Sequence, residues 1–136
     1  MERIFQHDHG RVTALEGLEI QGAKILINED DDSIVVIWLC SRQDNTWYRI
    51  FIDGIYCAVD AYQTDGSRSD LDDGIKMADI SSEFGTARIL TARVENQVSD
   101  NRLCLILETK LQSWQLNYDT VSGQCRLEKS DRSVKR

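Results

Sequence analysis

Proline is absent from the 136 residues of this chain, and histidine occurs only at His7 and His9. Without proline, the turns have to be shaped by glycine, asparagine and aspartate. A Cys-His catalytic pair would have to use a histidine at the very start of the chain. The sequence also lacks a G-x-S-x-G nucleophile elbow, a P-loop and a G-x-G-x-x-G dinucleotide motif. We therefore expect no cofactor, and only acid–base chemistry by carboxylate pairs is left open for an enzyme.

A membrane segment and a signal peptide are missing as well. No apolar run approaches the roughly 20 residues that a membrane helix needs, and the first ten residues, MERIFQHDHG, contain no apolar core. We therefore expect a cytoplasmic protein with no membrane partner. The chain has 23 acidic residues against 16 lysines and arginines, a net charge of −7. That balance repels phosphate backbones, so we expect no nucleic acid, and it suits a protein partner with a basic surface.

The cysteines and the short acidic or histidine-containing segments do not predict a metal site. None of the four cysteines belongs to a C-x-x-C pair: Cys40, Cys57, Cys104 and Cys125. Each lies in an apolar or alternating stretch, which predicts reduced, buried thiols, with a scattered zinc site as the alternative. His7-Asp8-His9 lacks an assignable third ligand, and the acidic run 29–32 lacks the glycine and the spacing of a calcium loop. We expect no bound metal.

The clearest structural signal is the segment 46–62, TWYRIFIDGIYCAVDAY. Asp53-Gly54 between two alternating runs predicts a β-hairpin with a two-residue turn, in which Ile52 pairs with Ile55. One face would be apolar and lie on the core: Tyr48, Ile50, Ile52, Ile55, Cys57 and Val59. The other face would be aromatic and charged: Trp47, Arg49, Phe51, Tyr56, Ala58 and Asp60. Phe51 would then lie opposite Tyr56, with Arg49 diagonal to Asp60.

That second face is richer in aromatic and charged side chains than a plain hydrated sheet face. Either another part of the chain covers it, or it is an exposed binding patch, because tryptophan, tyrosine and arginine anchor protein interfaces. The candidate partner-binding residues are accordingly five: Trp47, Arg49, Phe51, Tyr56 and Asp60. The structural alternative for Asp60 is a salt bridge to Arg49.

The rest of the chain also reads mostly as strands. The run 34–40, IVVIWLC, is apolar on both faces and predicts a central strand. Further strands are expected at 19–28, 87–96, 102–109, 113–119 and 124–128. Short helices are expected at 13–18 and 79–84. The prediction is a single α+β domain over 1–136, with a mostly antiparallel sheet of about seven to eight strands and two short helices.

The longest polar interruption is 63–74, QTDGSRSDLDDG, which predicts a surface loop that acts as a linker or a lid. The halves on either side of it, 10–62 and 79–128, share an order of landmarks. In each, a helical segment, a glycine-led strand, an apolar run, a Trp-led strand and a Gly- and Cys-containing strand follow one another. The halves are either two α-β-β-β-β repeats or two meanders alike by chance. A true repeat would give Trp47 and Trp114 equivalent places and would put the Trp47 face in the core.

A small, acidic, β-rich chain without a catalytic set fits a protein-interaction module best, such as an inhibitor, an immunity-type protein or an assembly factor. One alternative is a small-molecule-binding or enzymatic β-fold with an aromatic pocket lined by Trp38, Trp47, Tyr56 and Tyr62. Another is a structural homo-oligomer, for instance a homodimer, joined through edge strands or through the aromatic face.

Overall fold

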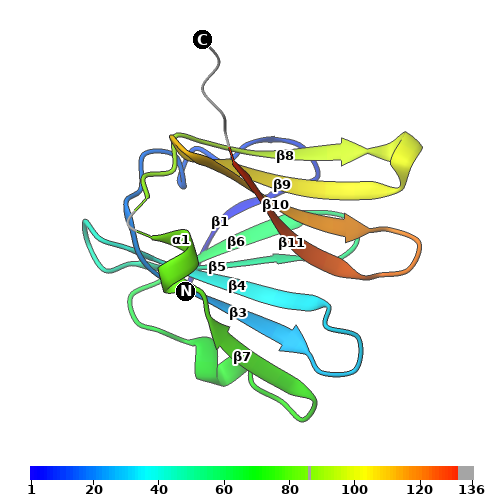
Figure 1. Ribbon diagram of the computed structural model, residues 1–136, viewed down its shortest axis with the longest axis horizontal. Helices are drawn as coiled ribbons and strands as arrows, with labels where there is room; N and C mark the ends of the chain where they lie inside the picture. The colour runs from blue at the N-terminus through cyan, green and yellow to red at the C-terminus, as the bar shows by residue number, and fades with distance from the viewer. Residues whose placement is uncertain (86, 132–136) are drawn as a thin grey trace.

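The computed structural model describes residues 1–85 and 87–131, and it shows two antiparallel sheets packed face to face (Figure 1). The six-stranded sheet has the order β1-β6-β5-β4-β3-β7, and the five-stranded sheet has the order β11-β10-β9-β8-β2. The strands of the first sheet are β1 (Glu2–His7), β3 (Ile20–Asn28), β4 (Ile34–Ser41), β5 (Trp47–Ile52), β6 (Cys57–Tyr62) and β7 (Ile75–Asp79). Those of the second are β2 (Gly10–Arg11), β8 (Thr91–Gln97), β9 (Arg102–Glu108), β10 (Gln112–Asp119) and β11 (Cys125–Asp131).

Helix is scarce in the described part of the chain. It is limited to α1 (Ser81–Phe84) and two 3-10 turns, η1 (Ser67–Asp70) and η2 (Val98–Asp100). The helix expected at 79–84 is present as one turn, which starts where the Ser81 N–H donates to Asp79 Oδ1 at 2.8 Å. The prediction of a helix at 13–18 is wrong, because this segment forms turns and Gly17 has a φ of 88°. The fold is therefore mostly antiparallel sheet, with eleven strands and very little helix.

The main core fills the space between the two sheets. In β9 the leucines at alternate positions point into it, and they share it with inward-facing residues of β5 such as Ile50. This is the period-two pattern of a strand whose face is buried. Cys104 and Ile106 alternate with those leucines and are also buried, at 1% and 4% exposure, on the outer side of the same strand. The nearly continuous apolar sequence of β9 is explained by burial on both faces.

Each sheet contains four consecutive strands that pair in order, β3 to β6 in one and β8 to β11 in the other. This strand order agrees with the landmarks of the two sequence halves. The tryptophans of those halves do not correspond, however. Trp114 is in the main core and stacks on Phe84 at 4.8 Å, whereas Trp47 lies on the outer side of the six-stranded sheet. The duplication therefore stays a prediction, and the equivalent places it implied for Trp47 and Trp114 are not observed.

Two strands that the sequence pattern did not predict flank the first meander. β1 pairs with β6 through a register shift between Arg3 and Phe5, and β7 pairs with β3. Both are short edge strands without a clean apolar alternation, which is why periodicity misses them. Because β7 lies beside β3 and β6 lies on the other side of β5, the connecting loop 63–74 has to cross the sheet.

Candidate functional site

The hairpin of β5 and β6 forms with a longer turn than the sequence predicted. Ile52 pairs with Cys57 and not with Ile55, so residues 53–56 all belong to the turn. Asp53 holds this turn, because its Oδ1 accepts the N–H groups of Ile55 at 3.2 Å and of Tyr56 at 3.3 Å. The shift of two residues keeps each strand residue on its predicted face. Ile55 leaves the apolar face, however, and is 74% exposed at the turn.

The outer face of the six-stranded sheet is covered in part by the loop 63–74. Trp38, which is 1% exposed, forms a second small core with Leu26 and Val36 beneath this loop. The loop packs closely there, since a Cβ on Gly66 would lie only 2.9 Å from Trp38 Cη2. We call the loop 63–74 the strap. The sequence left open whether this face is covered by the chain or is an exposed binding patch. Around Trp38, the chain itself covers it.

Asp70 attaches the strap to the sheet through three hydrogen bonds. Trp38 Nε1 donates to Asp70 Oδ2 at 2.9 Å, and Arg49 donates to both carboxylate oxygens at 2.9 and 3.0 Å. The second attachment is the ion pair between Lys24 and Asp65. Burial acts to raise the pKa of Asp65, but its bonds to Lys24 and to the Ser67 N–H outweigh burial and lower that pKa. The strap is thus held by two charged contacts, one at Asp65 and one at Asp70.

Asp60 is buried at 2% exposure and forms an ion pair with Arg3 of β1. Arg49 lies opposite Asp60 in the register, with Nη1 at 3.8 Å from Asp60 Oδ2. The two guanidinium groups flank the Phe51 ring, with Arg49 Cζ at 4.6 Å and Arg3 Cζ at 5.6 Å from its centre. Arg49 and Asp60 are therefore engaged in contacts within the chain, and removing either would leave a buried or half-buried charge without its partner.

The structure does not bring the five predicted site residues into one exposed patch. Trp47, Phe51 and Tyr56 are half-buried. Trp47 pairs with Cys40 at the start of β5, whereas Tyr56 lies in the turn at the far end of that strand. Of the four residues expected to line an aromatic pocket, three pack on one another, with the Trp38 ring at 5.0 Å from Tyr62 and at 6.4 Å from Trp47, whereas Tyr56 lies in the turn.

Six turns gather at one end of the sandwich, on the right of Figure 1. Strand registers place them together, and hydrogen bonds join neighbouring segments, one between the two sheets and one within the six-stranded sheet. The Cys125 N–H donates to Ser33 Oγ at 2.8 Å, and the Glu29 N–H donates to the Gly74 carbonyl at 2.8 Å. We call this end the acidic end, and it consists of the turns 8–9, 29–33, 53–56, 72–74, 98–101 and 120–124.

The acidic end carries no lysine or arginine in its six turns. Its nine acidic residues are Asp8, Glu29, Asp30, Asp31, Asp32, Asp53, Asp72, Asp73 and Asp100. Lys76 Nζ, at 3.5 Å from Asp32 Oδ1, is the one lysine or arginine paired with any of them in the described residues. The sequence showed the run 29–32, but only the pairing of β3 with β7 brings 72–74 beside it.

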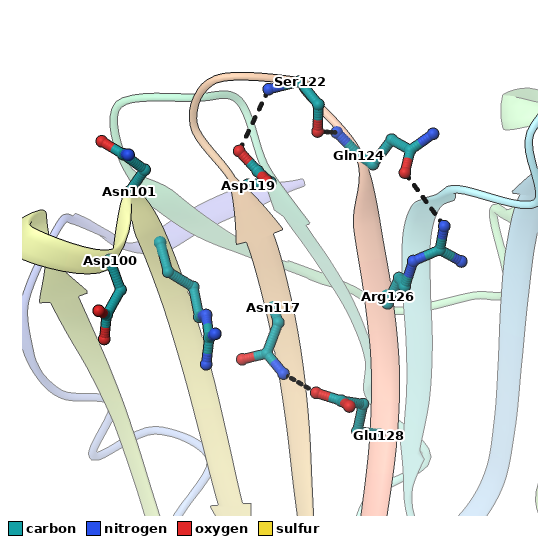
Figure 2. Close-up of a pocket in the computed structure, with 9 residues that line it drawn as sticks. Asp100, Asn101, Asn117, Asp119, Ser122, Gln124, Arg126 and Glu128 are labelled. Atoms are coloured by element: carbon teal, nitrogen blue, oxygen red, sulfur yellow. Dashed lines mark hydrogen bonds between the residues drawn. The ribbon is translucent and has the colours of Figure 1, made fainter.

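A polar hollow of about 230 Å³ lies at the foot of the turns 98–101 and 120–124 (Figure 2). Asn117 of β10 lines it and donates its amide N–H to Glu128. Asn117 Oδ1 is buried and has no hydrogen-bond partner among the residues that the structure describes, and Figure 2 shows it pointing away from Glu128. Arg102, Arg126 and Asp119 also line the hollow. This mixture suits a small ligand that offers both hydrogen-bond donors and acceptors.

A larger and more apolar hollow of about 560 Å³ lies at the opposite end of the sandwich, between α1 and the turn that joins β9 to β10. Phe84 is buried in its wall, and Leu90 and Leu111 are exposed beside it. Sequence reasoning missed both hollows. Their walls come from segments that are far apart in the chain, and no local pattern signals such a wall.

The part of the chain that the structure describes contains no group of three or more His, Cys, Asp or Glu side chains placed to hold a metal ion. The four cysteines are buried, unpaired thiols, as the sequence predicted. Burial, with a smaller effect of a neighbouring cysteine, raises the pKa of Cys57 and of Cys125 to about 12, so neither thiol is activated. None of the described helices is long and apolar enough to cross a membrane.

Comparison of the chain with protein-family models, with curated proteins and with solved structures finds no match.

Proposed function

We propose that this chain is a protein-interaction module, without catalysis, that binds a basic protein partner through its acidic end. One observation carries the proposal, namely the separation of charge within the molecule. Nine of the 23 acidic residues are in the six turns of the acidic end, where no lysine or arginine occurs. The other 14 acidic residues share the rest of the chain with 16 lysines and arginines, which gives that remainder a net charge of +2.

Such a separation favours association with an oppositely charged surface. A patch of one sign raises association rates by about 10- to 1000-fold through electrostatic steering, and the effect weakens as salt is added. Charges distributed evenly over the surface would not orient a partner. The acidic end is therefore expected to act mainly on the rate and orientation of encounter.

The turns at this end are held in shape by their own carboxylates. Asp31 Oδ1 accepts the Ser33 N–H at 2.9 Å, and Asp53 caps its turn in the same way. Asp119, the last residue of β10, accepts the N–H groups of Val121 and Ser122, and these bonds lower its pKa. Preformed turns reduce the conformational entropy that binding has to remove, which supports a role in recognition.

The test is capture of partners from native cell lysate on the immobilised chain, at low and at moderate salt, with quantitative mass spectrometry. The acidic-end variant carries Asp30→Asn, Asp72→Asn and Asp73→Asn. The matched control carries Glu2→Gln, Glu83→Gln and Asp131→Asn at the opposite end of the sandwich. Both variants change the net charge from −7 to −4, since each neutralises three of the 23 acids.

We expect the wild type and the control to capture the same basic protein at low salt and to lose it at moderate salt. The acidic-end variant should capture markedly less of it. Equal capture by the two variants would show that the position of the charges does not matter, and the proposal would then be wrong. A partner that is acidic or insensitive to salt would contradict it as well.

A second candidate function is binding of a small apolar ligand, and the hollow of about 560 Å³ beside Phe84 favours it. This volume is in the usual range of ligand pockets. A thermal-shift screen of small apolar compounds tests it, with Leu111→Asp as the comparison. Stabilisation of the wild type and not of that variant would support ligand binding there, and no stabilising compound would argue against it.

A further inference from the structure

The geometry points to three aliphatic side chains at the acidic end as the anchor of the interface: Ile55, Val98 and Val121. This inference rests on the proposed function and adds the kind of surface that the partner presents. We infer that the partner offers an apolar hollow with lysines and arginines around its rim. We call the three residues the aliphatic tips.

The aliphatic tips are unusually exposed for their residue types. Ile55 and Val98 are 74% exposed and Val121 is 77% exposed, against 47% for Leu90 and 66% for Leu111 at the opposite end. A single exposed aliphatic residue on a protein surface is ordinary and needs no explanation. These three differ because each occupies a separate turn of the same end of the sandwich.

The three turns form one connected platform. The Thr120 N–H donates to the Asn101 carbonyl at 2.9 Å, which joins the turn of Val121 to the turn of Val98. The turn of Ile55 meets the same platform at Tyr118, because a Cβ on Gly54 would lie 3.2 Å from Tyr118 Oη. Gly123 lies beside that hydroxyl group too, at 3.7 Å by the same measure. The tips are therefore carried by neighbouring turns of both sheets.

Each aliphatic tip has an aspartate two residues away in the chain. The pairs are Asp53 with Ile55, Val98 with Asp100, and Asp119 with Val121. In two of the three the carboxylate accepts the backbone N–H of the tip itself, at 3.2 Å for Ile55 and 2.8 Å for Val121. The turns thus present an aliphatic group and a carboxylate together, in a fixed relation.

This pairing determines the chemistry of the partner surface. Interfaces commonly have an apolar centre that is desolvated and a polar rim that remains hydrated. A flat basic surface would satisfy the aspartates and leave the aliphatic tips in water. An uncharged apolar surface would bury the tips and desolvate the aspartates without compensation. An apolar hollow with a basic rim satisfies both groups.

The experiment extends the capture from native lysate and uses three variants of the whole chain. The tip variant carries Ile55→Ser, Val98→Ser and Val121→Ser. Its control carries Leu90→Ser and Leu111→Ser at the opposite end. The third is the acidic-end variant with its three Asp→Asn changes. The captured protein is followed through timed washes at low and moderate salt, which separates its dissociation rate from its initial binding. Thermal unfolding of each variant checks the fold.

We expect the tip variant to release the captured protein about tenfold faster or more at either salt concentration, because the apolar contact does not depend on ionic screening. The control should release it at the wild-type rate. The acidic-end variant should bind less protein at the start, with a weaker dependence on salt and little change in release.

The two proposals fail in different ways. Release from the tip variant at the wild-type rate, with capture still reduced in the acidic-end variant, would overturn the anchor and leave the interaction function standing. Unchanged capture by both variants would overturn both proposals. Failure of the wild type to capture any protein from native lysate at low salt would remove the proposed function, and the anchor with it. If the tip variant does not fold, the single change Val121→Ser takes its place, and we then expect release about threefold faster than from the wild type.

Discussion

Asp70→Ala is the change that tests most directly how the strap is held. The Asp70 carboxylate accepts hydrogen bonds from Trp38 Nε1 and from two nitrogens of Arg49. Alanine removes all three bonds at once. It leaves a half-buried guanidinium group and a buried indole N–H without this acceptor. The strap should then detach from the outer face of the six-stranded sheet while the main core between the sheets stays intact.

The size of the effect follows from the burial of the two partners. The side chains of Asp70 and Arg49 are 16% and 22% exposed, so water can replace part of what is lost. Hydrogen bonds to charged groups contribute about 1.5–3 kcal/mol each when buried, and breaking a fully buried ion pair costs about 3–5 kcal/mol. Allowing for partial hydration, we expect the free energy of unfolding to fall by about 2–4 kcal/mol. A surface ion pair would give about 0–1 kcal/mol.

The assay is urea unfolding followed by tryptophan fluorescence, combined with hydrogen exchange of peptides from the strap. Asp72→Ala, in the same loop but exposed, is the control. Asp70→Ala should lower the unfolding midpoint and speed exchange in 63–74 more than in β9. A loss of about 0.5 kcal/mol or less, equal to that of Asp72→Ala and with unchanged exchange, would refute the view that this carboxylate holds the strap.

Three further changes probe the same structure. Gly66→Ala should lower the free energy of unfolding by about 1–3 kcal/mol, because its Cβ would lie 2.9 Å from Trp38 Cη2, whereas Gly22→Ala, with its nearest contact at 3.6 Å, should be nearly neutral in the same urea assay. Folding lowers the pKa of Asp65, so the ionised carboxylate stabilises the fold above about pH 4, and this stabilisation is lost as the pH falls through the folded-state pKa. Asp65→Asn should therefore reduce the acid-induced loss of stability. Unfolding midpoints measured as a function of pH test this. Cys57 and Cys125, buried and with pKa values raised to about 12, should react with a thiol reagent at pH 8 only after unfolding, and rapid labelling of the native chain would contradict their burial.

The sequence was sufficient to predict the strands whose side chains alternate or are buried on both faces. The runs 34–40, 102–109 and 113–119 correspond closely to β4, β9 and β10. In β10 the predicted apolar face, with Trp114 and Leu116, points into the main core and the polar face points outward. These features depend on residues two positions apart, which local periodicity records.

Features that depend on distant contacts could not be predicted in this way. The two-residue turn at Asp53-Gly54 was a reasonable expectation, but the capping bonds of Asp53 select a four-residue turn. The sequence indicates the strap only as a polar loop. Its contacts with Arg49 and Trp38 cross 21 and 32 residues of sequence. Of the acidic end, the sequence indicates only the run 29–32. The other carboxylates are brought beside this run by the order of the strands.

The way in which the two sheets are covered explains why recognition is expected at the turns. The strap covers Trp38 on one outer face. On the other, Arg93 of β8 donates to Glu95 at 2.8 Å and to Glu108 at 3.2 Å, in a layer of long polar side chains over buried Cys104 and Ile106. A partner that used either face would have to displace ion pairs already formed within the chain. At the acidic end the aliphatic tips and most of the carboxylates already face solvent, so a complementary surface could bury them without breaking any of those ion pairs.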